Sequence, residues 1–138
     1  MTPHLFVDTD VVLDLLARRE PFYPAAARLF SQAERGLLHL SVSALCFSHL
    51  FYILRKELSA PGALEVLRKL LRLVSILPVD EGVIRKALEG DFADFEDAIQ
   101  HETALAGGAE RIVTRNVKGY RGARLPVVTP EDLTLNSA

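Results

Sequence analysis

Residues 5–16, LFVDTDVVLDLL, predict the first strand and the first helix of the fold. The apolar run that opens this stretch ends on the carboxylate of Asp8. Apolar residues then recur at helical spacing, and Thr9 or Asp10 can cap the first turn. Open α/β sheets bind ligands just beyond the carboxyl ends of their strands. Asp8 is therefore a candidate site residue.

Strands alternate with helices from this unit to the end of the chain. Each predicted strand is a short apolar run, which is typical of a parallel sheet covered by helices on both faces. The sequence thus predicts an α/β fold. The expected strands cover residues 5–8, 37–42, 74–79, 111–114 and 126–129, and the expected helices cover residues 9–19, 21–35, 44–58, 62–73, 80–89 and 94–107.

The composition indicates an ordinary globular protein. The chain has 138 residues, of which 49% are hydrophobic and 25% charged, and this length suits one domain. We expect a single domain over residues 1–135 and a short loose tail over residues 136–138. Cys46 is the only cysteine, so no internal disulfide can form, and the expected location is a reduced cytosol.

Neither membrane insertion nor export is expected. The sequence has no apolar run of about eighteen residues, and its start lacks the basic segment and apolar core of a signal peptide. The formal net charge of -2 argues against a broad basic surface for nucleic acid. Any contact with nucleic acid is therefore expected to be local.

A second group of acids, Asp94, Glu96 and Asp97, begins the helix predicted over 94–107. Asp94 and Asp97 lie three residues apart, so they share a face at the helix start. One interpretation is structural, with Asp94 as the N-cap and Asp97 as its capping-box partner. The other is a site in which these acids and Asp8 share a divalent cation such as Mg²⁺ or Mn²⁺. Such a cation takes oxygen ligands and can activate water against a phosphodiester.

Asn116 follows the strand predicted over 111–114, as Asp8 follows the first strand. The two side chains converge if these strands are neighbours in the sheet. The loop at residues 114–124, TRNVKGYRGAR, surrounds Tyr120 with basic residues: Arg115, Lys118, Arg121 and Arg124. It could hold a single-stranded backbone and stack a base, although a solvated loop explains the same residues.

Four motifs in order resemble a PIN domain, in particular the small prokaryotic VapC-like proteins. They are FVDTDVVLDLL at 6–16, SALCFSHLFYILRK at 43–56, DFEDAIQ at 94–100 and IVTRNVKGY at 112–120, followed by LPVVTP at 125–130. The resemblance implies a three-layer α/β/α sandwich around a parallel sheet of about five strands, ordered 3-2-1-4-5. It also implies a Mg²⁺- or Mn²⁺-dependent ribonuclease, often the toxin of a toxin–antitoxin pair and often a homodimer.

The resemblance also assigns roles by motif matching. Asp8 and Asp97 are implied to bind the metal, Asp94 and Asn116 to complete the catalytic group, and Thr114 to be an accessory residue. The RNA contacts expected from the basic loop are Arg115, Lys118, Tyr120 and Arg121.

Two positions depart from the family pattern. His49 stands at or next to the place of a common glutamate, on a helix where a lone histidine is more often structural than a ligand. Gly119 occupies an often acidic position. Each change removes negative charge and lowers the expected metal affinity, although His49 remains a possible accessory residue.

Two functions from different classes follow. The first is an endoribonuclease with an antitoxin that lays a helix or extended segment against the helices from Ala44 to Leu73. The second is a PIN-fold protein without catalysis that binds RNA or protein. A flavodoxin-like phosphoacceptor domain ranks below both, because the chain lacks paired acids after the first strand and a lysine after the last.

Overall fold

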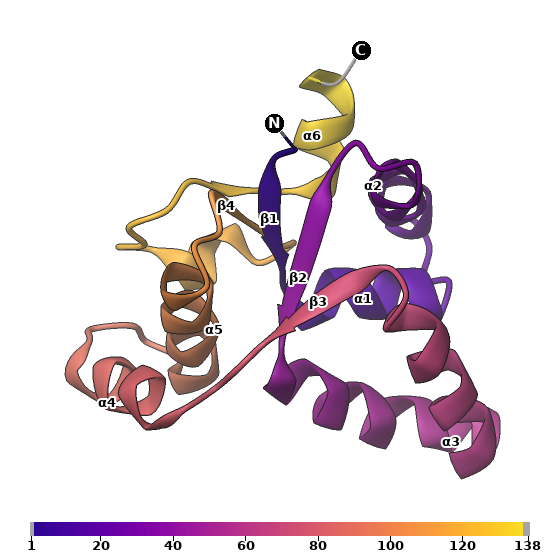
Figure 1. The fold of residues 1–138 in the computed structure, drawn as a ribbon, viewed down its shortest axis with the longest axis horizontal. Helices are drawn as coiled ribbons and strands as arrows, with labels where there is room; N and C mark the ends of the chain where they lie inside the picture. Colours follow the sequence, from indigo (N-terminus) through magenta and orange to yellow (C-terminus); the bar gives the residue numbers. More distant parts are fainter. Residues whose placement is uncertain (1, 137–138) are drawn as a thin grey trace.

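A five-stranded parallel sheet forms the centre of the computed structural model, which describes residues 2–136 (Figure 1). Its order is β3-β2-β1-β4-β5, as the sequence analysis predicted, and every neighbouring pair is parallel. The strands are β1 His4–Val7, β2 His39–Ser43, β3 Val74–Leu77, β4 Arg111–Val113 and β5 Val127–Val128. The carboxyl ends of β1 and β4 therefore lie side by side.

Helices cover both faces of the sheet, which confirms the three-layer architecture (Figure 1). The α-helices are α1 Thr9–Leu16, α2 Tyr23–Glu34, α3 Ala44–Leu70, α4 Glu81–Glu89, α5 Phe95–Ala106 and α6 Pro130–Asn136, and a 3-10 helix η1 covers Val117–Tyr120. Helices α1, α2 and α3 pack on one face, and α4 and α5 pack on the other.

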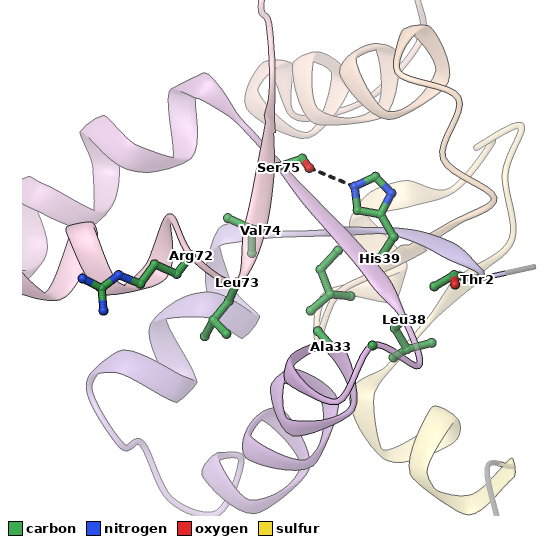
Figure 2. Close-up of a pocket in the computed structure, with 10 residues that line it drawn as sticks. Thr2, Ala33, Leu38, His39, Arg72, Leu73, Val74 and Ser75 are labelled. Atoms are coloured by element: carbon green, nitrogen blue, oxygen red, sulfur yellow. Dashed lines mark hydrogen bonds between the residues drawn. The ribbon is translucent and has the colours of Figure 1, made fainter.

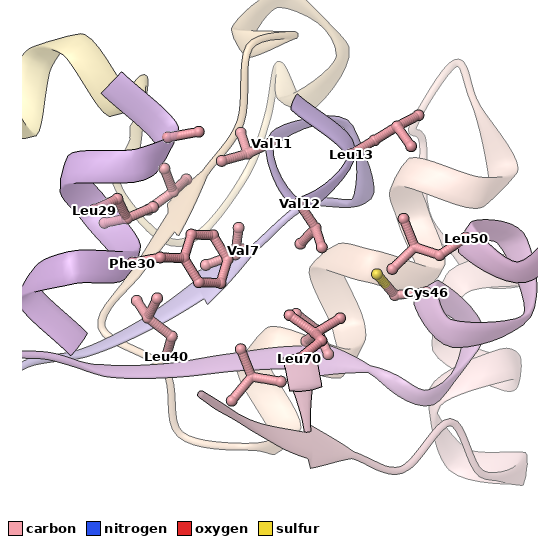
Figure 3. Packing of buried hydrophobic residues seen from close by; sticks show 14 of the residues in the cluster. Val7, Val11, Val12, Leu13, Leu29, Phe30, Leu40, Cys46, Leu50 and Leu70 are labelled. Carbon is pink, nitrogen blue, oxygen red and sulfur yellow. The ribbon is translucent and has the colours of Figure 1, made fainter. Parts of the chain in front are cut away.

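The alternation of side chains along β1 explains how one strand contributes to both layers. Leu5 and Val7 belong to the larger apolar cluster with α1, α2 and α3 (Figure 3), whereas Phe6 packs with Ile112 and Tyr120 on the α5 side. All of these side chains are buried. Full burial stabilises the fold by about 1.5–3 kcal/mol for each large apolar side chain, so this strand anchors both halves of the core.

The break expected between the helices of residues 44–58 and 62–73 is confirmed, because helix α3 is kinked at Ser59, where φ is 64° and ψ is 166°. Two details differ from the sequence predictions. Helix α1 ends at Leu16 instead of residue 19. Helix α6 was not predicted, although Thr129 and Asp132 exchange the two hydrogen bonds of a capping box, both at 3.2 Å.

The predicted tail begins inside helix α6, because Asn136 is its last residue. Ser137 and Ala138 lie outside the described residues. Across residues 2–136, no helix is both long enough and apolar enough to traverse a membrane.

Candidate functional site

Asp8 accepts hydrogen bonds from several elements at the carboxyl edge of the sheet. Its Oδ1 accepts hydrogen bonds from the backbone N–H of Thr9 at 2.7 Å and from Nε2 of Gln100 at 3.3 Å. Its Oδ2 accepts from the hydroxyls of Thr114 at 3.0 Å and Tyr120 at 2.9 Å. Asp8 is only 8% exposed, so these four donors fix its orientation.

Thr114 and Tyr120, which both follow β4, donate the two hydrogen bonds to Oδ2 of Asp8. Thr114 follows β4, is fully buried, and accepts a hydrogen bond from the backbone N–H of Asn116 at 3.0 Å. Burial raises the pKa of Tyr120, so its phenol keeps its proton and donates to Asp8. The neighbouring strands β1 and β4 thus bring Asp8 and Thr114 together, whereas the sequence analysis expected Asn116 to meet Asp8.

Asp10 is a third acid at this edge, and the sequence analysis assigned it only a capping role. Its Oδ2 accepts from the backbone N–H of Arg115 at 3.1 Å, and its Oδ1 is buried with no hydrogen-bond partner in the described part of the chain. Burial and the charge of Asp8 raise the pKa of Asp10 to about 6. The sequence signal that could have identified Asp10 as a site residue is the motif DTD at residues 8–10, in which it lies two residues after Asp8.

Asp97 approaches the same edge from the first turn of α5. Burial raises its pKa to about 7, and the charges of Asp8, Asp94, Glu96 and Asp10 add to the rise. The acids predicted from distant parts of the sequence therefore lie within electrostatic range of one another. Asp94 itself is exposed and is the N-cap of α5, where its Oδ1 accepts from the N–H of Asp97 at 2.9 Å.

Asn116 reaches Asp97 rather than Asp8. Its Nδ2 lies 3.5 Å from Oδ2 of Asp97, which is a long hydrogen bond. Gly119 closes on the same pair, because a Cβ at this position would lie 2.5 Å from Oδ2 of Asp97. A side chain at this position would displace the ends of the Asn116 and Asp97 side chains, so the glycine leaves room for both groups.

His49 is paired with an acid of α5. Its Nδ1 lies 3.0 Å from Oε1 of Glu96, and both side chains are partly exposed. The position that commonly carries a glutamate therefore does not add a carboxylate here; instead its histidine contacts one contributed by α5.

Two of the expected RNA contacts require correction. The side chain of Tyr120 is buried beneath the loop, and the residue is only 2% exposed, so its ring is not offered to a base. The Arg115 guanidinium donates to both oxygens of the buried Asp14, at 2.6 and 3.2 Å, and lies 3.9 Å from the Phe22 ring centroid. Lys118 and Arg121 are exposed, as a contact with nucleic acid requires.

The acids fit a hard divalent cation in atom type and charge. Asp8 and Asp97 would hold the cation, with Asp10 beside them. Two observations indicate negative charge that lacks compensation: Oδ1 of Asp10 has no hydrogen-bond partner among the described residues, and the pKa of Asp97 is raised. Within residues 2–136, however, no three acidic, histidine or cysteine side chains are gathered closely enough to form a metal site as they stand.

A large cavity lies away from these acids. It has a volume of about 410 Å³ and is lined by the amino-terminal parts of β2 and β3, where His39 contacts Ser75 at 2.9 Å (Figure 2). The acids follow the opposite ends of the strands. Cavity size alone therefore does not indicate the chemical site.

Several solved structures have the same fold, and two of them are described as a toxin or a toxin–antitoxin complex. A DNA-bound VapBC from Salmonella typhimurium matches with a TM-score of 0.70 and 14% identity, covering 94% of this chain and 99% of that chain. A toxin–antitoxin complex from Klebsiella pneumoniae matches with a TM-score of 0.68 and 22% identity, covering 91% and 97%. VapC20 from Mycobacterium tuberculosis, a toxin that cleaves the sarcin–ricin loop, matches with a TM-score of 0.61 and 16% identity, covering 78% and 86%.

These identities establish similarity of fold. A search of curated protein sequences found no match. A family model described as the PIN domain matches residues 4–118, which include the first strand, the acids of α5 and the loop after β4. The chain therefore belongs to the PIN domain family.

Proposed function

We propose that this protein is a metal-dependent endoribonuclease that hydrolyses RNA phosphodiester bonds. The observation that carries the proposal is that Asp8, Asp10 and Asp97 lie within electrostatic range of one another at one edge of a PIN fold, where burial and the acidic neighbours raise the pKa of Asp97 to about 7. Carboxylates crowded in this way favour binding of Mg²⁺ or Mn²⁺.

The residues at this edge would have three roles: to hold the metal, to orient its ligands and to contact the RNA. Asp8, fixed by four donors, and Asp97, which is partly exposed, would hold the metal. A bound divalent ion supplies an activated water and stabilises charge on the phosphate. Asn116 orients the Asp97 carboxylate, Thr114 orients Asp8 and Asp10, and Asp94 fixes the first turn of α5. Lys118 and Arg121 would contact the RNA backbone.

The biological setting proposed is that of a toxin with an antitoxin partner, acting in the cytoplasm as a homodimer. Support comes from structural neighbours described as a toxin–antitoxin complex and as a toxin. Exposed apolar side chains on α3, Tyr52, Leu58 and Leu64, offer a surface on which an antitoxin segment could lie.

Cleavage of single-stranded RNA by the purified protein with Mn²⁺ tests the nuclease proposal. Asp97→Asn is the most informative variant, because it removes a charge without breaking the hydrogen bonds of Asp8. We expect cleavage to fall at least 100-fold, while the control Glu65→Gln on the exposed surface of α3 leaves it unchanged. Equal rates in Asp97→Asn and the wild type would overturn the assignment of Asp97.

A second candidate function is a PIN-fold protein that binds RNA or protein without cleaving. The observations that favour it are the pairing of His49 with Glu96 and the occupation of both Asp8 oxygens by protein donors. Calorimetry that detects no binding of millimolar Mn²⁺, together with an intact complex with RNA or an antitoxin, would select this function.

A further inference from the structure

A groove leads away from the acids along helix α5. One wall is the loop of residues 90–93, and the other is the loop of residues 118–124. Two adjoining cavities of about 290 and 260 Å³ form it, and they share Asp91, Arg121 and Gly122. Gly119 lines the inner cavity and also closes on Asp97. The groove is therefore continuous with the candidate metal centre.

Arg124 lines the outer cavity and is held there by two buried side chains. Its Nη2 donates to both carboxylate oxygens of Glu102, at 3.1 and 2.9 Å. Its backbone N–H donates to Nε2 of His101 at 3.0 Å, so Nδ1 of that ring carries the proton and donates to Glu102 at 3.0 Å. The arginine side chain is nevertheless 65% exposed, whereas that of Glu102 is 9% exposed.

This arrangement orients a guanidinium without using all of its donors. Arginine has five N–H donors, and the bonds to Glu102 use only those of Nη2. No acceptor among the side chains and backbone described for residues 2–133 bonds to its Nε or Nη1. A long side chain that is already fixed loses less conformational entropy when it binds an anion. The buried pair of His101 and Glu102 thus prepares Arg124 for a ligand in the groove.

The lining of the groove has an excess of positive charge. Lys118 lines the inner cavity, Arg121 lines both, and Arg124 lines the outer one. Asp91 and Glu102 contribute two opposing carboxylates, which leaves an excess of one positive charge. An anion is therefore a better ligand here than a cation.

The length of the groove fits a nucleic-acid backbone that passes the acids. Asp97 and Glu102 are five residues apart on α5, which is about 7.5 Å along the helix axis. This separation equals about two nucleotides at the rise of about 3.4 Å along the duplex axis for each nucleotide of one strand. An extended single strand covers it in fewer nucleotides.

We infer that Arg124 and Arg121 bind a backbone phosphate of single-stranded RNA one or two nucleotides from the phosphate at the acids. The identity of the ligand rests on the proposed function. This phosphate site is separate from the acids. Its two guanidinium groups would make contacts with RNA in place of those expected from Arg115 and Tyr120.

Binding of RNA without cleavage tests the inference directly. Fluorescence anisotropy would follow a fluorescein-labelled oligouridylate of eight nucleotides in EDTA. The double variant Glu102→Gln/Arg124→Gln keeps the net charge of the protein and leaves no buried charge unpaired. We expect its affinity to fall about tenfold and the slope of log affinity against log salt to decrease in magnitude by about 0.7.

Two further variants complete the experiment. Arg121→Gln, on an exposed residue, should weaken binding in the same direction and provides the test if the double variant does not fold. Arg72→Gln removes the same charge beside the large cavity at the other end of the sheet (Figure 2) and should leave the affinity unchanged.

The outcomes separate this inference from the nuclease proposal. Loss of affinity in the groove variants, in a protein that does not cleave with Mn²⁺, supports the groove and contradicts the nuclease. Cleavage with an unchanged KM in those variants supports the nuclease and overturns the groove. The groove inference also fails if the wild type does not bind the oligouridylate, or if the variants lose only a protein partner.

Discussion

Asp8 and Asp97 are the two acids expected to share a metal, yet the protein holds them in opposite ways. Asp8 is buried and accepts hydrogen bonds from Thr9, Gln100, Thr114 and Tyr120. Asp97 is partly exposed, and its carboxylate contacts Asn116 at 3.5 Å amid the charges of other acids. The first acid is therefore part of the scaffold, whereas the second carries uncompensated charge that a ligand can relieve.

The largest effect expected from this comparison is on stability. Asp8→Ala would remove the cap of α1 and leave the buried Tyr120 hydroxyl without its acceptor, at a cost of about 3–5 kcal/mol. Asp97→Ala should cost less than about 1 kcal/mol. Urea denaturation of the metal-free proteins measures both values, and equal losses of unfolding free energy would contradict the comparison.

A smaller effect should depend on pH. The pKa of Asp97 is about 7 in the folded protein, above its value of about 3.9 in an unfolded chain. Folding is therefore penalised once Asp97 is ionised in both states, above about pH 7, and the penalty shrinks as the pH falls from 7 toward 4. Asp97→Asn should raise the Tm of the metal-free protein more at pH 8 than at pH 5.

The control for this experiment is Glu65→Gln, which changes an exposed acid on α3. Its effect on Tm should be small at both pH values. A Tm increase in Asp97→Asn that is equal at pH 8 and pH 5 would show that burial and the neighbouring acids do not raise the pKa of Asp97.

The smallest effect is expected at His49. Its contact with Glu96 joins two partly exposed side chains, so His49→Gln should lower the unfolding free energy by about 0.5 kcal/mol or less. Cleavage should stay within twofold of the wild type if Glu96 merely adds to the charge around Asp97. A tenfold change in Mn²⁺ affinity, measured by calorimetry, would instead place His49 and Glu96 in the metal site.

Much of the fold was accessible from sequence because its signals are local. Apolar runs placed all five strands, and the order of four motifs indicated their arrangement. Helix α6 was missed although Thr129, Pro130 and Asp132 spell a capping box with proline at the first helical position.

The site was less accessible because its hydrogen bonds join residues far apart in the chain. Asp14 reads as an ordinary helical acid, and only the structure shows it buried beneath Arg115. The same contact pairs the partly exposed Arg115 with Asp14, although the basic loop suggested that this arginine contacts RNA. Nothing in the sequence around Tyr120 distinguishes a buried donor to Asp8 from a stacking aromatic.

The hydrogen bonds of Asp8 also have a consequence for biosynthesis. Three of its partners, Gln100, Thr114 and Tyr120, lie 92, 106 and 112 residues further along the chain. A growing polypeptide therefore cannot assemble this edge of the sheet until nearly all of the domain has left the ribosome. A protein that cuts RNA would in this way be kept inert beside the RNA-rich machine that makes it.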